Sequence, residues 1–265
     1  MDYLKTYGIP AIGIKRTTDG IDLHELESIF SKHDIKFFYT MPRLHNPLGT
    51  SYSKKTKDLI RKLAYQYNVY IVEDDYLADF EQNSKIDPIY TDDTQQHVIY
   101  LKSFSKIMFP GLRIGLAVLP NVLINTFQQY KNTTDIDSSM ISQAALELYL
   151  KSGMFERYQK KVSEAYASRA NQLQQSIATH LAEYPSSKGI CMHSHIVLPR
   201  QVNTNKLIQH LVQQNILLDP INRNYLDVFY HERILKINVS NVEESKIDAG
   251  IREIALALHS PKHHF

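Results

Sequence analysis

The sequence predicts an α/β fold: a mostly parallel central sheet with flanking helices, followed by a smaller C-terminal α+β domain. Two observations support this prediction. Apolar strand-like runs alternate with helix-like segments in the first part of the chain, which is typical of parallel sheets covered by helices. From about residue 183 onward, two strand-like and two helix-like segments form a second group. The length of 265 residues suits one large domain or two modest ones.

In the first part, the expected strands are short apolar runs at residues 35–40, 69–74, 97–103 and 114–120. A helix is expected over residues 53–67, with Ser53 as its N-cap. Its apolar side chains recur at helical spacing, and they are Leu59, Ile60, Leu63, Ala64 and Tyr67.

Residues 139–182 have helical periodicity interrupted only by Gly153, so they form either one long helix or a bent pair. Beyond them, residues 190–199 and 234–240 are strand-like, and residues 203–214 and 244–259 are helix-like. We therefore predict a partial large domain at residues 1–150 and a small domain at residues 151–265, joined through the long helix.

Composition excludes several classes of protein. The 30 basic and 28 acidic residues balance to a net charge of +2, which gives no electrostatic footprint for nucleic acid. Cys191 is the single cysteine, so no disulfide framework is expected and a cytoplasmic location is favoured. No apolar run approaches the ~18 residues of a membrane span. His45, His193 and His195 fit no metal-site spacing, so we expect core or surface histidines and no metal.

Three stretches contain the candidate binding and catalytic residues. They are HNPLGT (45–50), VEDDYLADF (72–80) and SFSKIMFPGLRIG (103–115). Each follows an apolar strand-like run. Ligands of open α/β sheets bind beyond the carboxyl ends of the strands, so the three stretches are expected to converge on one site.

Lys106 and Arg113 suggest the ligand. A lysine amine kept neutral can form a Schiff base with an aldehyde, and a guanidinium binds phosphate through two parallel hydrogen bonds. Ser103 and Ser105 add hydroxyl donors. A lysine beside a phosphate site points to pyridoxal 5′-phosphate (PLP), the usual phosphorylated aldehyde cofactor.

The other two stretches suit the same cofactor. Its pyridine nitrogen needs an acid to stay protonated, and Asp74 at a strand end can supply one. Its phenolic oxygen needs hydrogen-bond donors, and Asn46 and Tyr76 can supply them.

In this order, the motifs resemble those of the fold-type I, class I/II aminotransferases. The EDDY sequence, followed by an acid and Phe, most resembles the C-terminal domain of MocR-type transcriptional regulators. That family joins a GntR-type winged helix to an aminotransferase-like PLP domain that senses effectors. The resemblance covers almost the whole chain. It implies that Lys106 holds the cofactor covalently, Asp74 pairs with the pyridine nitrogen, and Ser103 and Arg113 hold phosphate. It also implies that Asn46 and Tyr76 contact the phenolic oxygen, with Tyr76 and Lys106 as catalytic residues, and that the complete protein is a homodimer.

Two departures from the family matter. No Gly-rich loop precedes HNPLG, and the family has more chain before the position of Met1, so a truncated chain with a half-built cofactor site is expected. In the segment ILKINVS, Lys236 occupies the place of the arginine that grips a substrate carboxylate. Lysine cannot form that bidentate fork, although Lys236 can attract a carboxylate as a point charge and Arg223 or Arg233 could substitute.

Three hypotheses follow. The first is a PLP-binding sensor of a small amino-acid-like effector, which reaches DNA only through a missing N-terminal domain. The second is a PLP-dependent aminotransferase of amino acids. The third is a remnant with impaired cofactor binding. The EDDY motif and Lys236 favour the first, and transaminase activity is left open.

Overall fold

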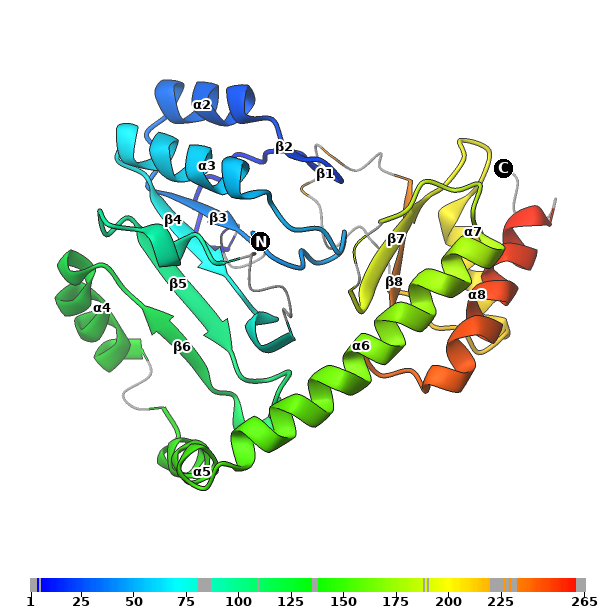
Figure 1. Ribbon diagram of the computed structural model, residues 1–265. Helices are drawn as coiled ribbons and strands as arrows, with labels where there is room; N and C mark the ends of the chain where they lie inside the picture. The colour runs from blue at the N-terminus through cyan, green and yellow to red at the C-terminus, as the bar shows by residue number, and fades with distance from the viewer. Residues whose placement is uncertain are drawn as a thin grey trace. The chain divides into compact units, whose positions relative to one another are not determined.

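The computed structural model describes residues 4, 6–80, 87–108, 110–134, 138–187, 189, 191–219, 226, 229 and 233–260 (Figure 1). The chain divides into two compact units, each described here by itself. Unit 1 comprises Met1–Asp19, His45–Thr50 and Ala165–Phe265, and unit 2 comprises Gly20–Leu44 and Ser51–Glu164.

Unit 2 is built on a four-stranded sheet in the order β3-β4-β5-β6. Its strands are β3 (Phe37–Thr40), β4 (Tyr70–Asp74), β5 (Val98–Ser103) and β6 (Gly115–Val118). The pairs β3–β4 and β4–β5 are parallel, whereas β5 and β6 are antiparallel. The predicted mostly parallel sheet is therefore confirmed. Strand β6 runs the other way because the eleven-residue connection from β5 is too short for a crossover helix.

Two helices, α2 (Leu23–Lys32) and α3 (Lys54–Gln66), pack against each other along one side of this sheet (Figure 1). Ser53 caps α3 as predicted, since its hydroxyl accepts a hydrogen bond from the Thr56 amide at 3.1 Å. Ile60 and Ala64 of the predicted apolar stripe are fully buried. On α2, the Phe30 ring packs edge to face against the Phe38 ring of β3, with ring centroids 6.0 Å apart.

The remaining elements of unit 2 are β2 (Gly20–Ile21), three single-turn 3₁₀ helices and the helices α4 (Asn121–Thr134) and α5 (Met140–Lys151). The 3₁₀ helices are η1 (Ala78–Phe80), η2 (Tyr90–Asp92) and η3 (Pro110–Leu112). Helix α6 (Met154–His180) begins in unit 2 and continues into unit 1 from Ala165.

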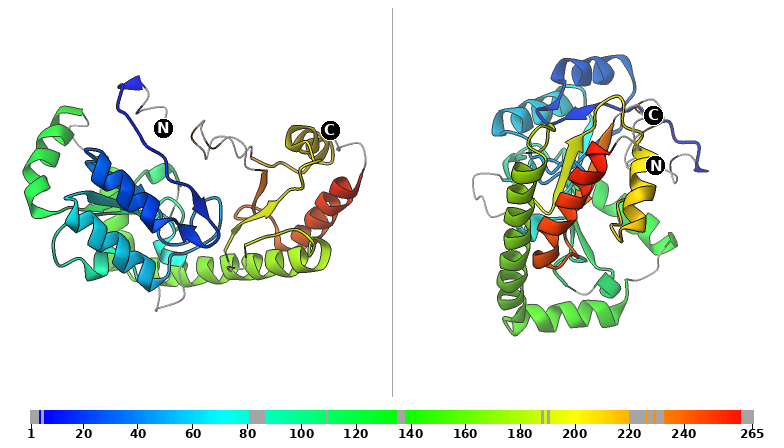
Figure 2. Two further views of the ribbon diagram at one scale, coloured as in Figure 1. Left: turned by 90° about the horizontal axis from the view of Figure 1, so that it is seen from above. Right: turned by 90° about the vertical axis from the view of Figure 1, so that its right-hand side faces the viewer.

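Of the two possibilities for residues 139–182, the bent pair is found. Helix α5 ends before Ser152 and α6 begins at Met154, and the two helices run in different directions (Figure 2). Gly153 has a φ of 67°, a left-handed conformation that glycine adopts without strain, so it ends α5 and permits the change of direction.

Unit 1 contains the predicted α+β elements. Strands β7 (His193–Val197) and β8 (Ile234–Asn238) are antiparallel, with β1 (Arg16–Thr17), α7 (Thr204–Gln213), α8 (Glu244–His259) and the end of α6. The core is formed by buried aliphatic side chains, including Leu173, Ile196, Leu207, Leu235 and Ile251. Of the two places expected for the histidines, core or surface, His193 and His195 lie in the core, and Cys191 is buried as well.

The predicted domain ranges of 1–150 and 151–265 stay a prediction. None of the helices that the structure describes combines the length and the hydropathy needed to cross a membrane.

Candidate functional site

Two predicted site residues end neighbouring parallel strands of unit 2. Asp74 is the last residue of β4 and is in register with Leu101, and Ser103 is the last residue of β5. Side chains alternate between the faces of a strand, so Asp74, Leu101 and Ser103 share one face at the carboxyl end of the sheet. Two of the three predicted stretches therefore meet at this edge, whereas HNPLGT belongs to unit 1, and the convergence of all three stays a prediction.

Lys106 and Arg113 both belong to the loop that connects β5 to β6. The loop is closed at its base, because Ser103 is in register with Gly115 and the Phe104 amide donates to the Ile114 carbonyl at 3.1 Å. Lys106 is half-buried and Arg113 is exposed. Both side chains are therefore presented by one short loop that begins at Ser103.

The loop is anchored by its apolar residues. Ile107 and Met108 are buried against Phe155 of α6, and the Ser105 amide donates to the Ser103 hydroxyl at 3.2 Å. Arg113 has a φ of 52°, a left-handed conformation that costs a non-glycine residue about 1–2 kcal/mol. The contacts of the anchored loop hold Arg113 in this backbone conformation. Arg113 is also a residue for which the sequence predicts phosphate binding.

Asp74 accepts a hydrogen bond from the hydroxyl of Tyr39, which the sequence did not single out. Burial raises the pKa of the Asp74 carboxyl, while the hydrogen bonds from Tyr39 and from the Tyr76 amide oppose that rise. Burial first, and then the hydrogen bond and the charge of Asp74, raise the pKa of the Tyr39 phenol, so this phenol remains a donor. Tyr76 itself donates its hydroxyl to the Leu44 carbonyl at 3.2 Å.

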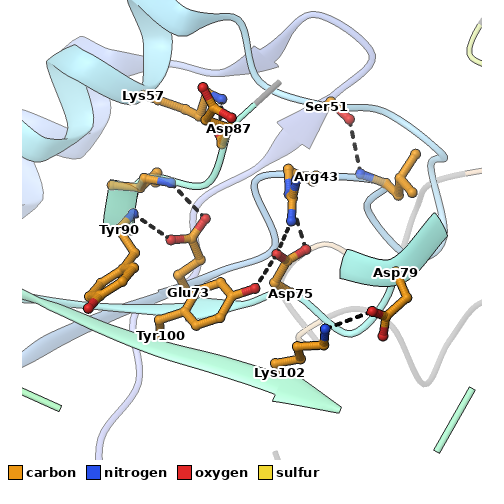
Figure 3. A network of polar contacts seen from close by, with 12 residues as sticks. Arg43, Ser51, Lys57, Glu73, Asp75, Asp79, Asp87, Tyr90, Tyr100 and Lys102 are labelled. Carbon is orange, nitrogen blue, oxygen red and sulfur yellow. Dashed lines mark hydrogen bonds and ion pairs between the residues drawn. The ribbon is translucent and has the colours of Figure 1, made fainter. Parts of the chain in front are cut away.

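The two acids on either side of Asp74 belong to a polar network on the other face of the sheet (Figure 3). Asp75 is buried and accepts from Nε of Arg43 at 3.2 Å, from a second Arg43 nitrogen, and from the Tyr100 hydroxyl at 2.8 Å. Glu73 is fully buried and accepts from the amides of Ile89 and Tyr90, each at 2.9 Å.

Burial raises the pKa of Glu73 to about 7 against the effect of these two amides. Lys102 pairs with Asp79 at 2.7 Å beyond the end of β4. The network therefore holds the strand end and the following turn in place, and it leaves Asp74 to face the opposite side. Sequence reasoning missed Arg43 and Tyr100, because only the pairing of distant segments brings them to Asp75.

Asn46 belongs to unit 1, in a turn of residues 45–50 that docks on β7. The Gly49 amide donates to the His45 carbonyl at 2.6 Å, and His195 Nδ1 lies 3.1 Å from the Leu48 carbonyl oxygen. Within the described part of the chain, the Asn46 Oδ1 atom is buried without a hydrogen-bond partner. This side chain keeps hydrogen-bonding capacity that a ligand could use.

Lys236 also belongs to unit 1. It lies on β8 in register with His195, is largely buried, and its Nζ is 4.0 Å from Asp219 Oδ2. Arg233 is exposed, and its Nη1 is 3.5 Å from the Pro199 carbonyl oxygen. Arg223, the other suggested substitute for the family's arginine, lies outside the described residues.

The side chains of unit 2 fit the chemistry of PLP. Asp74 is a carboxylate suited to a pyridinium nitrogen, Lys106 an amine suited to an aldehyde, and Arg113 with Ser103 a donor set suited to phosphate. A mostly parallel sheet with these groups at its edge is the arrangement expected of a fold-type I PLP-dependent transferase.

Comparison with known proteins gives the family. A model of the family "Aminotransferase class I and II" matches residues 2–254, so this chain belongs to that family. The structure is similar to the crystal structure of kynurenine aminotransferase from Pyrococcus horikoshii, with a TM-score of 0.87 and 23% identity over 96% of this chain and 66% of that one. At that identity the likeness concerns the fold.

Among curated proteins, the chain is 51% identical over 258 residues to the uncharacterized HTH-type transcriptional regulator YcxD of Bacillus subtilis. The match covers 95% of this chain and 58% of YcxD. It is also 27% identical over 150 residues to the probable rhizopine catabolism regulatory protein MocR of Rhizobium meliloti, covering 56% of this chain and 30% of MocR. The predicted resemblance to MocR-type regulators is thereby confirmed, and the chain spans less than two thirds of the length of each of these relatives.

Proposed function

We propose that this chain is the PLP-binding, effector-sensing domain of a MocR-type transcriptional regulator. The observation that carries the proposal is the edge of the unit 2 sheet, where Asp74 and Ser103 share a face and one anchored loop presents Lys106 and Arg113. The similarity to YcxD and MocR supports regulation as the purpose of that site.

In this proposal, Lys106 would hold the aldehyde carbon of PLP as a Schiff base, with loss of water, and Arg113 with the hydroxyls of Ser103 and Ser105 would hold the phosphate. Asp74 holds a proton on the pyridine nitrogen, and bound PLP then supplies an electron sink. The Tyr76 hydroxyl donates its one proton to the Leu44 carbonyl and fixes the turn after β4, so its predicted contact with the phenolic oxygen would require that proton to change partner. Assignment of the phenolic oxygen to Asn46 stays a prediction from the sequence.

An amino-acid-like effector is proposed because the aldehyde carbon of PLP, which Lys106 would hold, reacts with amines, and an amino acid carries one. Contact of Lys236 with the effector's carboxylate stays a prediction from the sequence, and within unit 1 the nearby Asp219 carboxylate competes for its charge. A weaker hold on the carboxylate suits reversible sensing better than rapid turnover. Aminotransferase activity toward amino acids is the second candidate, favoured by the family to which the chain belongs.

The proposal has three further parts. DNA would be bound through a winged-helix region outside these 265 residues, as the resemblance implies, because a net charge of +2 gives no electrostatic footprint for nucleic acid. The complete protein would be a homodimer, as the resemblance implies. A cytoplasmic location suits a regulator with a single buried cysteine.

The first experiment is a titration of the chain with PLP, followed by visible absorbance. We expect a band that is lost in Lys106→Ala and kept in Lys62→Ala, a control that removes an exposed lysine from α3. A spectrum of free PLP with all three proteins would refute cofactor binding and favour the remnant hypothesis.

A second experiment separates a sensor from an enzyme. The PLP-loaded chain is mixed with amino acids in turn, with and without a keto acid, while the band and the products are followed. A sensor changes its spectrum with particular amino acids and forms at most about one product per site. Sustained product formation over many turnovers would instead establish the aminotransferase.

A further inference from the structure

Tyr39 is a side-chain hydrogen-bond partner of Asp74. It lies on β3 in register with Val72 of β4, and Val72 and Asp74 point to the same face because side chains alternate along a strand. The Tyr39 hydroxyl reaches across and donates to Asp74 Oδ2. This contact lies on the face opposite to the Glu73 and Asp75 network.

The carboxylates of the two neighbouring acids already accept hydrogen bonds from other groups of the chain, so neither is placed to bind a ligand as Asp74 is. Asp75 is occupied by Arg43 and Tyr100, and Glu73 by two backbone amides. An ionised carboxylate has about four acceptor positions. At Asp74 the Tyr39 hydroxyl and the Tyr76 amide use part of that capacity, so positions remain for one more donor.

Electrostatic effects determine which of the two groups, the Tyr39 phenol or the Asp74 carboxyl, keeps the proton in this hydrogen bond. Burial alone favours the neutral form of the Asp74 carboxyl, and a donated hydrogen bond favours its charged form. The phenol cannot easily lose its proton beside this carboxylate, because burial and Asp74 both raise its pKa. Tyr39 therefore keeps Asp74 ionised and fixes the orientation of its oxygens.

We propose that Tyr39 is a positioning residue of the cofactor site, which holds Asp74 charged and aimed so that it accepts a hydrogen bond from the protonated ring nitrogen of PLP. The inference rests on the proposed function. It adds a residue that the sequence motifs do not contain, and it predicts an effect on the cofactor's protonation that simple packing of a strand tyrosine would not have.

The first part of the test uses the chain without cofactor. Tyrosine labelled with ¹³C in the ring is titrated by NMR, and the Tyr39 signal is assigned as the one missing from Tyr39→Phe. We expect its pKa to lie above the ordinary value and to fall in Asp74→Asn. A signal that titrates normally, or that is unchanged by Asp74→Asn, would overturn the proposal.

The second part uses PLP with Tyr39→Phe and the control Tyr130→Phe, which removes a hydroxyl from the exposed face of α4. In Tyr39→Phe we expect PLP affinity to fall about tenfold, the effect of one hydrogen bond to a charged group. The pH at which the visible band changes should move upward, because a less protonated ring withdraws fewer electrons from the Lys106 nitrogen. Tyr130→Phe should match the original chain.

The outcomes separate the two claims. If the original chain binds PLP and Tyr39→Phe binds it with the same affinity and the same pH profile, the role of Tyr39 is refuted and the proposed function stands. If the original chain forms no Lys106-dependent band, the proposed function fails and the role of Tyr39 fails with it. A tenfold loss without any pH shift would indicate packing alone and would also overturn the proposal.

Discussion

At the scale of single residues, the site depends on how three consecutive acids are divided between two faces of one sheet. Asp74 faces the candidate cofactor site, while Glu73 and Asp75 are buried on the other side. Asp75 carries its charge in the interior only because Arg43 and Tyr100 meet it. A buried charge without a partner is costly, so Arg43 is expected to be the most sensitive member of this group.

Replacing Arg43 tests this dependence. Arg43→Met leaves the Asp75 carboxylate buried without its cation, and we expect the free energy of unfolding to fall by about 3–5 kcal/mol. The double variant Arg43→Met with Asp75→Asn should lose less than the sum of the single changes. Urea denaturation measures both.

Lys36→Ala is the matched control, because Lys36 pairs with Asp34 at 2.7 Å on the surface. Its loss should cost at most about 1 kcal/mol. Equal effects of Lys36→Ala and Arg43→Met would contradict the account of Asp75.

Much of the site could be predicted at this scale because its residues follow strand ends in short motifs. Ser103, Lys106 and Arg113 belong to one short stretch and Asp74 to another, so local pattern and family resemblance were enough to choose these candidates. Tyr39 escaped prediction because nothing local sets FFYT apart from other apolar strands. Its importance depends on the register of β3 with β4, which places its hydroxyl beside Asp74.

At the scale of elements, the sequence predicted strands and helices well where hydrophobic periodicity was strong. It did not predict α2 or α4, and it gave no direction for β6. In α4, Leu123, Phe127 and Tyr130 recur at helical spacing, so the pattern was present but was not used, and none of the described residues of this helix is buried. The direction of β6 follows from a short connection, which is a property of topology rather than of composition.

The turn of residues 45–50 gives a prediction at this scale. A Cβ added to Gly49 would lie 2.4 Å from the His193 carbonyl oxygen, and Gly49 has a φ of 67°. Gly49→Ala should therefore push the turn away from β7 and destabilise the chain by about 2–4 kcal/mol. Differential scanning calorimetry of the variant measures this loss.

Gly250→Ala is the control for Gly49→Ala, since Gly250 lies within α8 and a Cβ there meets nothing within 4 Å. Alanine favours a helix over glycine, so this change should stabilise the chain by up to about 1 kcal/mol. Similar losses in both variants would show that the turn does not require its close approach to β7.

At the scale of the whole molecule, the two units should respond to pH in opposite directions. In unit 2, the pKa of Glu73 is raised from its ordinary 4.5 to about 7, mainly by burial. The folded unit then binds more protons than the unfolded chain between these values, so unit 2 gains stability as the pH falls through 7. Nearby Asp75 adds to this shift, and Arg43 opposes it.

In unit 1, the stability changes with pH in the opposite direction. Burial, with the charges of Arg16, His193 and His195, lowers the pKa of His45 from 6.5 to about 3. The unfolded chain binds more protons in this range, so unit 1 loses stability as the pH falls below 6.5.

Hydrogen exchange followed by mass spectrometry, corrected for intrinsic rates, can resolve the two units. From about pH 7.5 to about pH 5.5, protection should rise in β4 and fall in β7. Glu73→Gln should flatten the first response and His45→Gln the second. Parallel responses in both units would contradict the prediction.

The central claim is that this chain holds PLP through Lys106, and the most direct measurement is to find which lysine carries the cofactor. The chain is incubated with PLP, reduced with borohydride, digested and analysed by mass spectrometry. The account predicts a phosphopyridoxyl group on Lys106 and no other strongly labelled lysine. Labelling spread over exposed lysines such as Lys54 and Lys62, or none at Lys106, would contradict it.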